Sequence, residues 1–241
     1  MTDASDHAAL TRNEDPASER PTLAEDLLLL LYQPSSNVIA GEGTLYYVLA
    51  GAVLADLAEG GHVRTRAGHT GAMTVEAETD KPPTDRLLRA TWEYVADRPR
   101  GVQTVLAATG PTLREPLLER LIDRGDLRRT TRKTFGMFRT SVLEQGDADR
   151  RPRLLADVRA VLVDGAEPTP RLAALTALLY GSGTLPQFDR DIPWTSAVIA
   201  RAEELQSGNW GAGVAAIAVT RTVTATIVNS VVVAAGLLPR G

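Results

Sequence analysis

The sequence predicts a mostly α-helical protein, a single helical-bundle domain with one protruding β-hairpin and a second, shorter hairpin. Two observations lead to this fold class. Apolar residues recur at helical spacing in several segments that Gly and Pro separate. One segment, Leu27 to Leu31, is a run of consecutive leucines longer than one helical turn. A helix that is apolar on every side has to be surrounded by protein, so we expect this one at the centre of the domain.

The elements follow from local signals along the chain. Residues 1–20 contain few large apolar side chains and predict a disordered tail, which leaves 21–241 as the helical domain. Thr22 and Glu25 have capping-box spacing and predict the start of the leucine-rich helix, which should end before Pro34. A polar loop should follow it. We expect further helices over 45–59, 85–96, 102–108, 112–124 (opened by a second capping box, Thr112 with Glu115), 154–163, 172–180 and beyond 194, and hairpins over 62–77 and 127–140.

The composition of the chain excludes several classes of function. The net charge is −4 and there are no cysteines, which excludes disulfides and thiol catalysis and fits a reducing cytoplasm. The three histidines lack further ligands at metal-binding spacing, so we expect neither a metal nor a cofactor. No set of catalytic residues stands out, and we expect no enzyme. The enzymatic alternative is the loop over 181–194, where Asp189, Arg190 and Asp191 cluster.

The segment 111–140 differs from the rest of the chain in its charge, because it contains eight basic residues and four acidic ones. The planar guanidinium of arginine matches phosphate oxygens, so this segment could hold a phosphate headgroup or a nucleic-acid backbone. The competing interpretation is that the acidic residues of the same segment pair with these arginines on a solvated surface. The candidate phosphate-binding residues are Arg114, Arg128, Arg129, Arg132 and Lys133.

Large apolar residues stand beside these cations near the expected hairpin turn. Phe135, Met137 and Phe138 follow Lys133 closely, a composition typical of a membrane-surface or oligomer contact. A winged-helix-like module that binds nucleic acid or protein stays open, because the helices over 45–59 and 112–124 are each followed by a glycine and a hairpin. The negative charge of the whole chain counts against nucleic acid.

Several stretches together resemble the Golgi phosphoprotein 3 family and its bacterial relatives. The resemblance implies a mostly helical domain with a protruding hairpin, which in the family helps oligomerisation and membrane contact. Eukaryotic members are non-enzymatic adaptors for Golgi glycosyltransferases that bind phosphatidylinositol 4-phosphate at the membrane surface. The stretches are TLAEDLLLLL from Thr22, GAVLADLAEGGHV from Gly51, LLERLIDRGDL from Leu117, FGMF from Phe135 and RLAALTAL from Arg171.

The resemblance also locates the family's phosphate pocket, which uses a tryptophan and three basic residues. These positions fall at Gly41, Ala50, Pro111 and Arg114, of which only Arg114 matches the family. We therefore expect a cytoplasmic, peripherally membrane-associated protein that recognises anionic, phosphoinositide-like headgroups through its basic hairpin. A homo-oligomer formed through the hairpin is a further expectation, and no nucleic-acid partner is expected.

Overall fold

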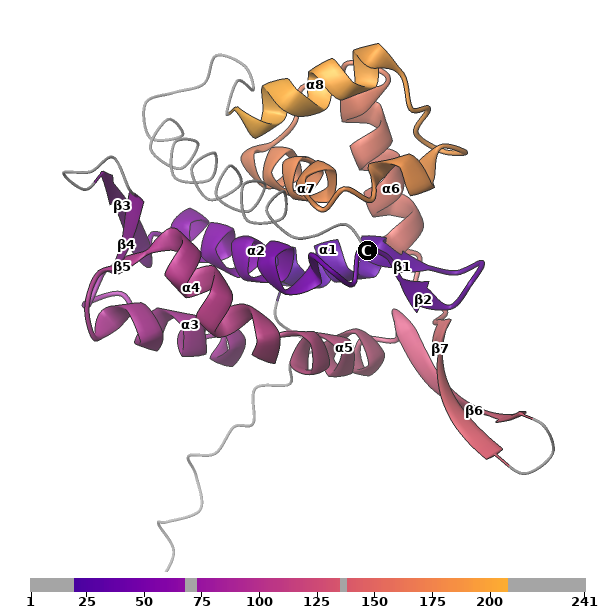
Figure 1. Ribbon diagram of the computed structural model, residues 1–241, viewed down its shortest axis with the longest axis horizontal. Helices are drawn as coiled ribbons and strands as arrows, with labels where there is room; N and C mark the ends of the chain where they lie inside the picture. The colour runs from indigo at the N-terminus through magenta and orange to yellow at the C-terminus, as the bar shows by residue number, and fades with distance from the viewer. Residues whose placement is uncertain (1–19, 68–72, 135–137, 208–241) are drawn as a thin grey trace, which may run out of the picture.

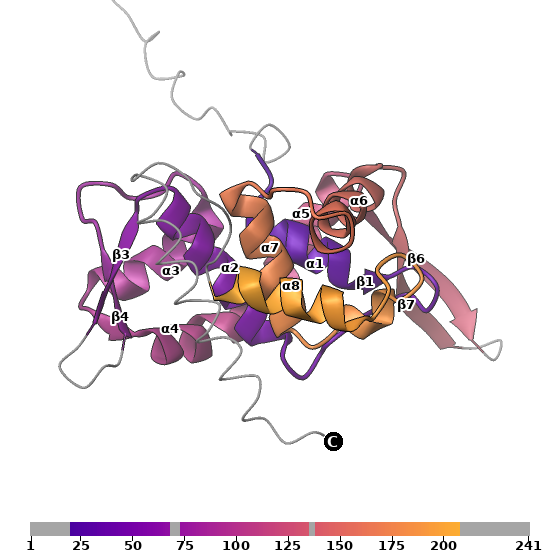
Figure 2. The same cartoon turned by 90° about the horizontal axis from the view of Figure 1, so that it is seen from above.

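The computed structural model describes residues 20–67, 73–134 and 138–207. It confirms the mostly α-helical fold with short hairpins. Helices pack around a central one, and a long two-stranded ribbon projects from one end of this body (Figures 1 and 2). The helices are α1 (Leu23–Leu31), α2 (Leu45–Glu59), α3 (Arg86–Ala96), α4 (Val102–Thr109), η1 (Gly110–Thr112), α5 (Arg114–Asp123), α6 (Arg150–Leu162), α7 (Pro170–Gly181), η2 (Leu185–Phe188) and α8 (Ser196–Gln206).

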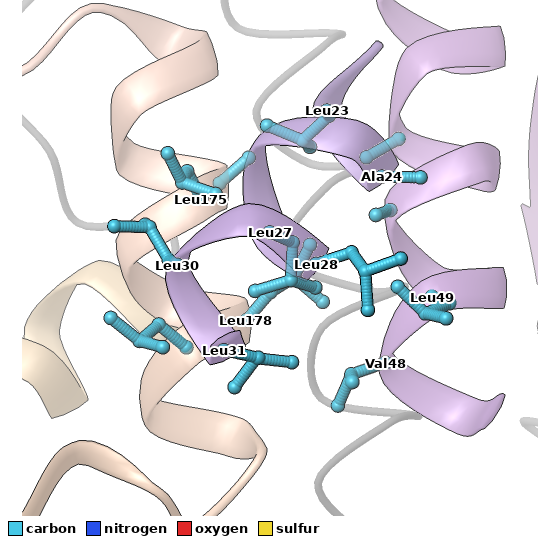
Figure 3. Packing of buried hydrophobic residues seen from close by; sticks show 14 of the residues in the cluster. Leu23, Ala24, Leu27, Leu28, Leu30, Leu31, Val48, Leu49, Leu175 and Leu178 are labelled. Carbon is cyan, nitrogen blue, oxygen red and sulfur yellow. The ribbon is translucent and has the colours of Figure 1, made fainter. Parts of the chain in front are cut away.

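Helix α1 is the central helix that the leucine run predicts. Its capping box is present, because the Thr22 hydroxyl accepts from the Glu25 amide at 3.1 Å and the Glu25 carboxylate accepts from the Thr22 amide at 2.9 Å. Leu27 to Leu31 are all 0% exposed. They are enclosed because α1 contacts α2, α5, α6 and α7, and Figure 3 shows leucines on opposite sides of α1 pointing toward α2 and toward α7.

The strands within the described ranges form three small antiparallel sheets. Both predicted hairpins are confirmed, although the second strand of the long one runs to Gln145, five residues beyond the expected end. A further short hairpin occupies what was expected to be a polar loop after α1, and its turn contains Asn37 with φ 57°. The sheets are β1 (Tyr32–Gln33) with β2 (Val38–Ile39), then β3 (Val63–Ala67), β4 (Met73–Ala77) and β5 (Arg100–Gly101) in that order, and β6 (Leu127–Thr134) with β7 (Phe138–Gln145).

Helices α2 and α5 share the expected helix–glycine–hairpin arrangement. Each is followed by a glycine with positive φ, 67° at Gly61 and 73° at Gly125, before the chain enters a hairpin. The second predicted capping box is wrong. Thr112 lies in the 3-10 turn that continues from α4, where its hydroxyl donates to the Thr109 carbonyl at 2.8 Å, and α5 therefore begins at Arg114 without a side-chain cap.

Some expectations concern residues outside the described part of the chain. These are the disordered tail (through residue 19), the turn over 68–72 and the helices beyond 207. Across the described ranges, no helix is both long enough and apolar enough to cross a membrane.

The base of the β6–β7 hairpin depends on a glycine that lies against another segment of backbone. A Cβ added at Gly146 would collide with the backbone of Gly125 and Asp126, and the Gly146 amide donates to the Asp126 carbonyl at 2.8 Å. We expect Gly146→Ala to lower the free energy of unfolding by about 1–3 kcal/mol, because the contact is with rigid backbone. Urea unfolding measures this. Gly43→Ala, whose added Cβ has no neighbour within 4 Å, is the control and should change stability by less than about 0.5 kcal/mol.

Candidate functional site

The β6–β7 hairpin carries most of the residues of the predicted site. Its strands pair continuously from Leu127 opposite Gln145 to Thr134 opposite Phe138, and the ribbon leaves the helical body near the end of α5 (Figure 1). At its base, the Tyr32 hydroxyl donates to the Leu143 carbonyl at 3.3 Å. The described strands of the ribbon thus meet the helical body at their base and run away from it (Figure 1).

The two arginines at the base of the hairpin pair with acidic residues. Arg128 stands opposite Glu144 in the strand register, and its Nε lies 3.2 Å from a carboxylate oxygen of that residue. Arg129 reaches back to α5, where its guanidinium nitrogens lie 2.9 Å from Glu119 and 3.4 Å from Glu115. Both arginine side chains are about half exposed, at 57% and 42%, so these ion pairs are weak and can exchange for another anion.

Arg114 is also paired. It is the first residue of α5, and its guanidinium contacts Glu115 at 2.8 Å and Glu42, in the loop before α2, at 3.2 Å. Its Nε is buried without a hydrogen-bond partner among the described residues. The structure thus joins the start of α5 to the loop at residues 41–43, but Glu42 occupies the arginine face that would otherwise be available to an anion.

The distal half of the hairpin has a different charge. The register places Arg132 opposite Thr140 and Lys133 opposite Arg139, and the sequence contains no acidic residue between Asp126 and Glu144. Phe135 and Met137 lie outside the described residues, as do the side chains of Arg132, Lys133 and Phe138.

Two arginines of the basic segment 111–140 are largely buried, because the side chains of Arg120 and Arg124 are only 16% and 11% exposed. Arg124 lies 2.7 Å from Glu25, which is 0% exposed, and Arg120 contacts Asp85, the N-cap of α3, at 2.6 Å. Both belong to a set of largely buried charges around the N-terminal half of α1, which we call the ion network. Its acidic members are Glu25, Asp26, Asp56, Asp85 and Asp126, and its basic members are Arg120, Arg124, Arg150 and Arg171.

Arg171 connects three parts of the fold within the ion network. From the first turn of α7 it donates to Asp56 on α2 and to Asp26 on α1, each at 2.8 Å, and to the Pro21 carbonyl at 2.7 Å. Burial raises the pKa of Asp26, against the opposing charges of Arg171 and Arg150. Through these hydrogen bonds the buried carboxylates of Asp26 and Asp56 share the guanidinium of Arg171.

Burial and the neighbouring arginines shift the pKa values of two other acidic members, Asp126 and Asp85, in opposite directions. Burial raises the pKa of Asp126, although Arg150 lies 2.8 Å away. Burial also acts to raise the pKa of Asp85, but the hydrogen bonds and charge of Arg120 outweigh it, so that this pKa lies below its ordinary value.

A cleft of about 550 Å³ opens onto this network. Its wall includes residues 20–22, the end of α2, the start of α3 and Arg171. His62 lies in the same wall, where its Nδ1 is 2.7 Å from the Lys81 carbonyl. This cleft was not predicted from the sequence. The acidic residues next to the leucine run do indicate buried ion pairs, since a fully enclosed helix must bury them and buried charges need partners.

The loop with the alternative enzymatic residues is organised by main-chain contacts. The Asp189 carboxylate accepts from the Trp194 amide at 2.8 Å, which closes the loop after η2. Arg190 and Asp191 are exposed. Nothing in the described part of this loop positions a nucleophile beside a base.

The fold and the hairpin define the class of this molecule: a mostly helical protein that presents a charged β-ribbon. The family model of Golgi phosphoprotein 3 (GPP34) matches residues 23–225, and the chain belongs to this family. No curated protein matched it.

The four positions at which the resemblance would place a phosphate pocket offer little that could bind a phosphate. Ala50 is fully buried in α2, and Gly41 has φ 72° and faces Ser182 and Thr184. Pro111 is exposed in η1. Only Arg114 provides a cation there, and Glu42 pairs with it.

Proposed function

We propose that this protein is a non-enzymatic, peripheral membrane protein that binds anionic, phosphoinositide-like headgroups through the β6–β7 hairpin, with the cytoplasm as its compartment. The main support is the separation of charge along the hairpin. Its base carries arginines that already have acidic partners, whereas no acidic residue accompanies the distal residues Arg132, Lys133 and Arg139. The proposal assigns Phe135, Met137 and Phe138 to the boundary between headgroups and acyl chains.

Arg114, Arg128 and Arg129 have a secondary role in this proposal. Their ion pairs are half exposed and weak, so a lipid phosphate can replace Glu42, Glu115 or Glu144 when the hairpin reaches the surface. Exchange of one anion for another gives less net energy than binding to cations that have no acidic residue near them in the sequence of the hairpin. The distal residues should therefore contribute most of the affinity.

The expected result is a large loss of membrane binding when the distal charges are removed. Each basic residue near an anionic surface contributes about 1 kcal/mol, so replacing Arg132, Lys133 and Arg139 together by alanine should weaken binding roughly a hundredfold. Replacing Arg128 and Arg129 should weaken it by less than about tenfold. Co-sedimentation with phosphatidylcholine vesicles, with or without phosphatidylserine, measures both.

The control variant removes three positive charges from parts of the surface outside the hairpin. Arg64, Arg66 and Arg159 are exposed and ion-paired on other parts of the surface, and their joint replacement by alanine should leave vesicle binding nearly unchanged. Equal binding by the distal variant and the unmodified protein would exclude the hairpin mechanism.

Two further measurements concern the ligand. Vesicles that contain phosphatidylinositol 4-phosphate at matched charge report headgroup preference. Binding to duplex DNA tests the winged-helix alternative, which predicts DNA binding with a steep salt dependence.

The proposal includes assembly through the same hairpin. The ribbon has two strands, so each has an unpaired edge, to which a second copy can add. Two ribbons side by side would double the number of cations on one surface. Sedimentation with and without vesicles distinguishes assembly in solution from assembly on the membrane.

A further inference from the structure

A short segment before α1 covers the most deeply buried carboxylate of the cleft. We call residues 20–22 the N-terminal strap. The Leu23 amide, directly after the strap, donates to Asp56 at 2.6 Å, and the Pro21 carbonyl accepts from Arg171, which also binds Asp56. The Asp56 side chain is only 8% exposed. The strap and the cleft wall thus keep Asp56 from water.

We propose that the N-terminal strap is a pH-sensitive cover over Asp56, which is closed most firmly while this carboxyl is protonated and opens more readily as the carboxyl loses its proton. The geometry carries this inference. Asp56 and Asp26 share the single guanidinium of Arg171, and the Glu59 carboxylate lies 3.8 Å from the same group. Arg171 therefore faces three carboxylates. A second cation, Arg150, lies 3.6 Å from Asp26 but also pairs with Asp126 at 2.8 Å, so carboxylates still outnumber cations and ionised Asp56 is incompletely compensated where it is buried.

The direction of the effect follows from proton linkage. Burial raises the pKa of Asp56 from 3.8 to about 7, against the opposing charge of Arg171 and the Leu23 hydrogen bond. When the strap opens, water reaches the carboxyl and its pKa returns toward its ordinary value near 4. Between about pH 4 and pH 7 the closed form binds one proton at Asp56 that the open form does not bind. Closure is therefore most favourable near pH 4, weakens as the pH rises, and does not change further above about pH 7.

Other charged groups around Asp56 come from each neighbouring element. Arg20 lies on the strap, Asp85 begins α3, and His62 precedes β3, and all three line the cleft. Helix α4 also packs on α2, but its sequence contains no charged residue. His62 lines the same cleft as Asp56, so replacing it provides the matched control for the replacement of Asp56.

Amide hydrogen exchange of Leu23 tests the cover on the full chain. After correction for the intrinsic rate, its protection should fall about tenfold per pH unit between pH 5 and 7 and then level off. Asp56→Asn keeps an acceptor for the amide without the titrating proton, and should abolish this slope. His62→Gln should keep the slope. Glu59→Gln removes a negative charge that raises the pKa of Asp56, and should move the levelling-off point to lower pH.

Two results would overturn the proposal. One is protection of Leu23 that does not depend on pH from 5 to 7 in the unmodified protein, and the other is the same slope in Asp56→Asn. A carboxyl NMR titration of Asp56 in the unmodified chain gives an independent reading, and a midpoint near 4 would also exclude it.

Discussion

Arg171→Met should lower the free energy of unfolding by about 3–5 kcal/mol at pH 8, the largest effect that we expect from a single charge. Methionine fills much of the volume of the arginine side chain but provides no charge and no donor. Asp26 and Asp56 would then be buried without the guanidinium that they share, so each carboxyl would either stay uncompensated or have to bind a proton at pH 8, and the Pro21 carbonyl would lose its donor. Urea unfolding at fixed pH measures the loss.

The pH dependence of this variant separates charge from packing. Without Arg171 the pKa values of both carboxylates should rise further, because burial then acts with less opposition. Protonation at lower pH removes the uncompensated charge, so the destabilisation should shrink between pH 8 and pH 5. The control is Arg159→Met, an exposed arginine paired with Asp164, which should cost less than about 1 kcal/mol. A loss independent of pH would attribute the effect to packing.

Features within a few residues of one another were predictable from the sequence. The capping box of Thr22 and Glu25 involves adjacent backbone, and the ends of α2 and α5 follow from glycines that adopt positive φ. The burial of α1 followed from its lack of a polar side. The failure at Thr112 has the same local origin, because a preceding 3-10 turn used the position that the capping box required.

Contacts between distant residues were not predictable in this way. Asp56 and Arg171 are 115 positions apart, and their hydrogen bond exists only because α2 and α7 pack against α1. Arg120 and Arg124 have the same spacing as residues of a solvated helix face, yet that face of α5 lies against Glu25 and Asp85. Charge in the sequence therefore located a basic segment but could not divide it between the core and the surface.

The leucine run leads to the second large prediction, which concerns packing alone. Leu28 is 0% exposed, and Figure 3 shows it on the side of α1 that faces Val48 and Leu49 of α2. We expect Leu28→Ala to lower the free energy of unfolding by about 2–5 kcal/mol, because the lost side chain leaves a cavity between two helices that other contacts hold in place. Thermal and urea unfolding measure the change.

Two further variants show whether the lost volume is the cause. Leu28→Met keeps nearly the same volume and should cost less than about 1.5 kcal/mol. Val38→Ala removes apolar atoms from a residue that is 53% exposed, and should change stability by less than about 0.5 kcal/mol. If Leu28→Ala cost as little as Val38→Ala, α1 could not be the enclosed helix around which the others pack. Since the N-terminal half of the same helix carries Glu25 and Asp26, the ion network would then lack the rigid support that holds its charges in place.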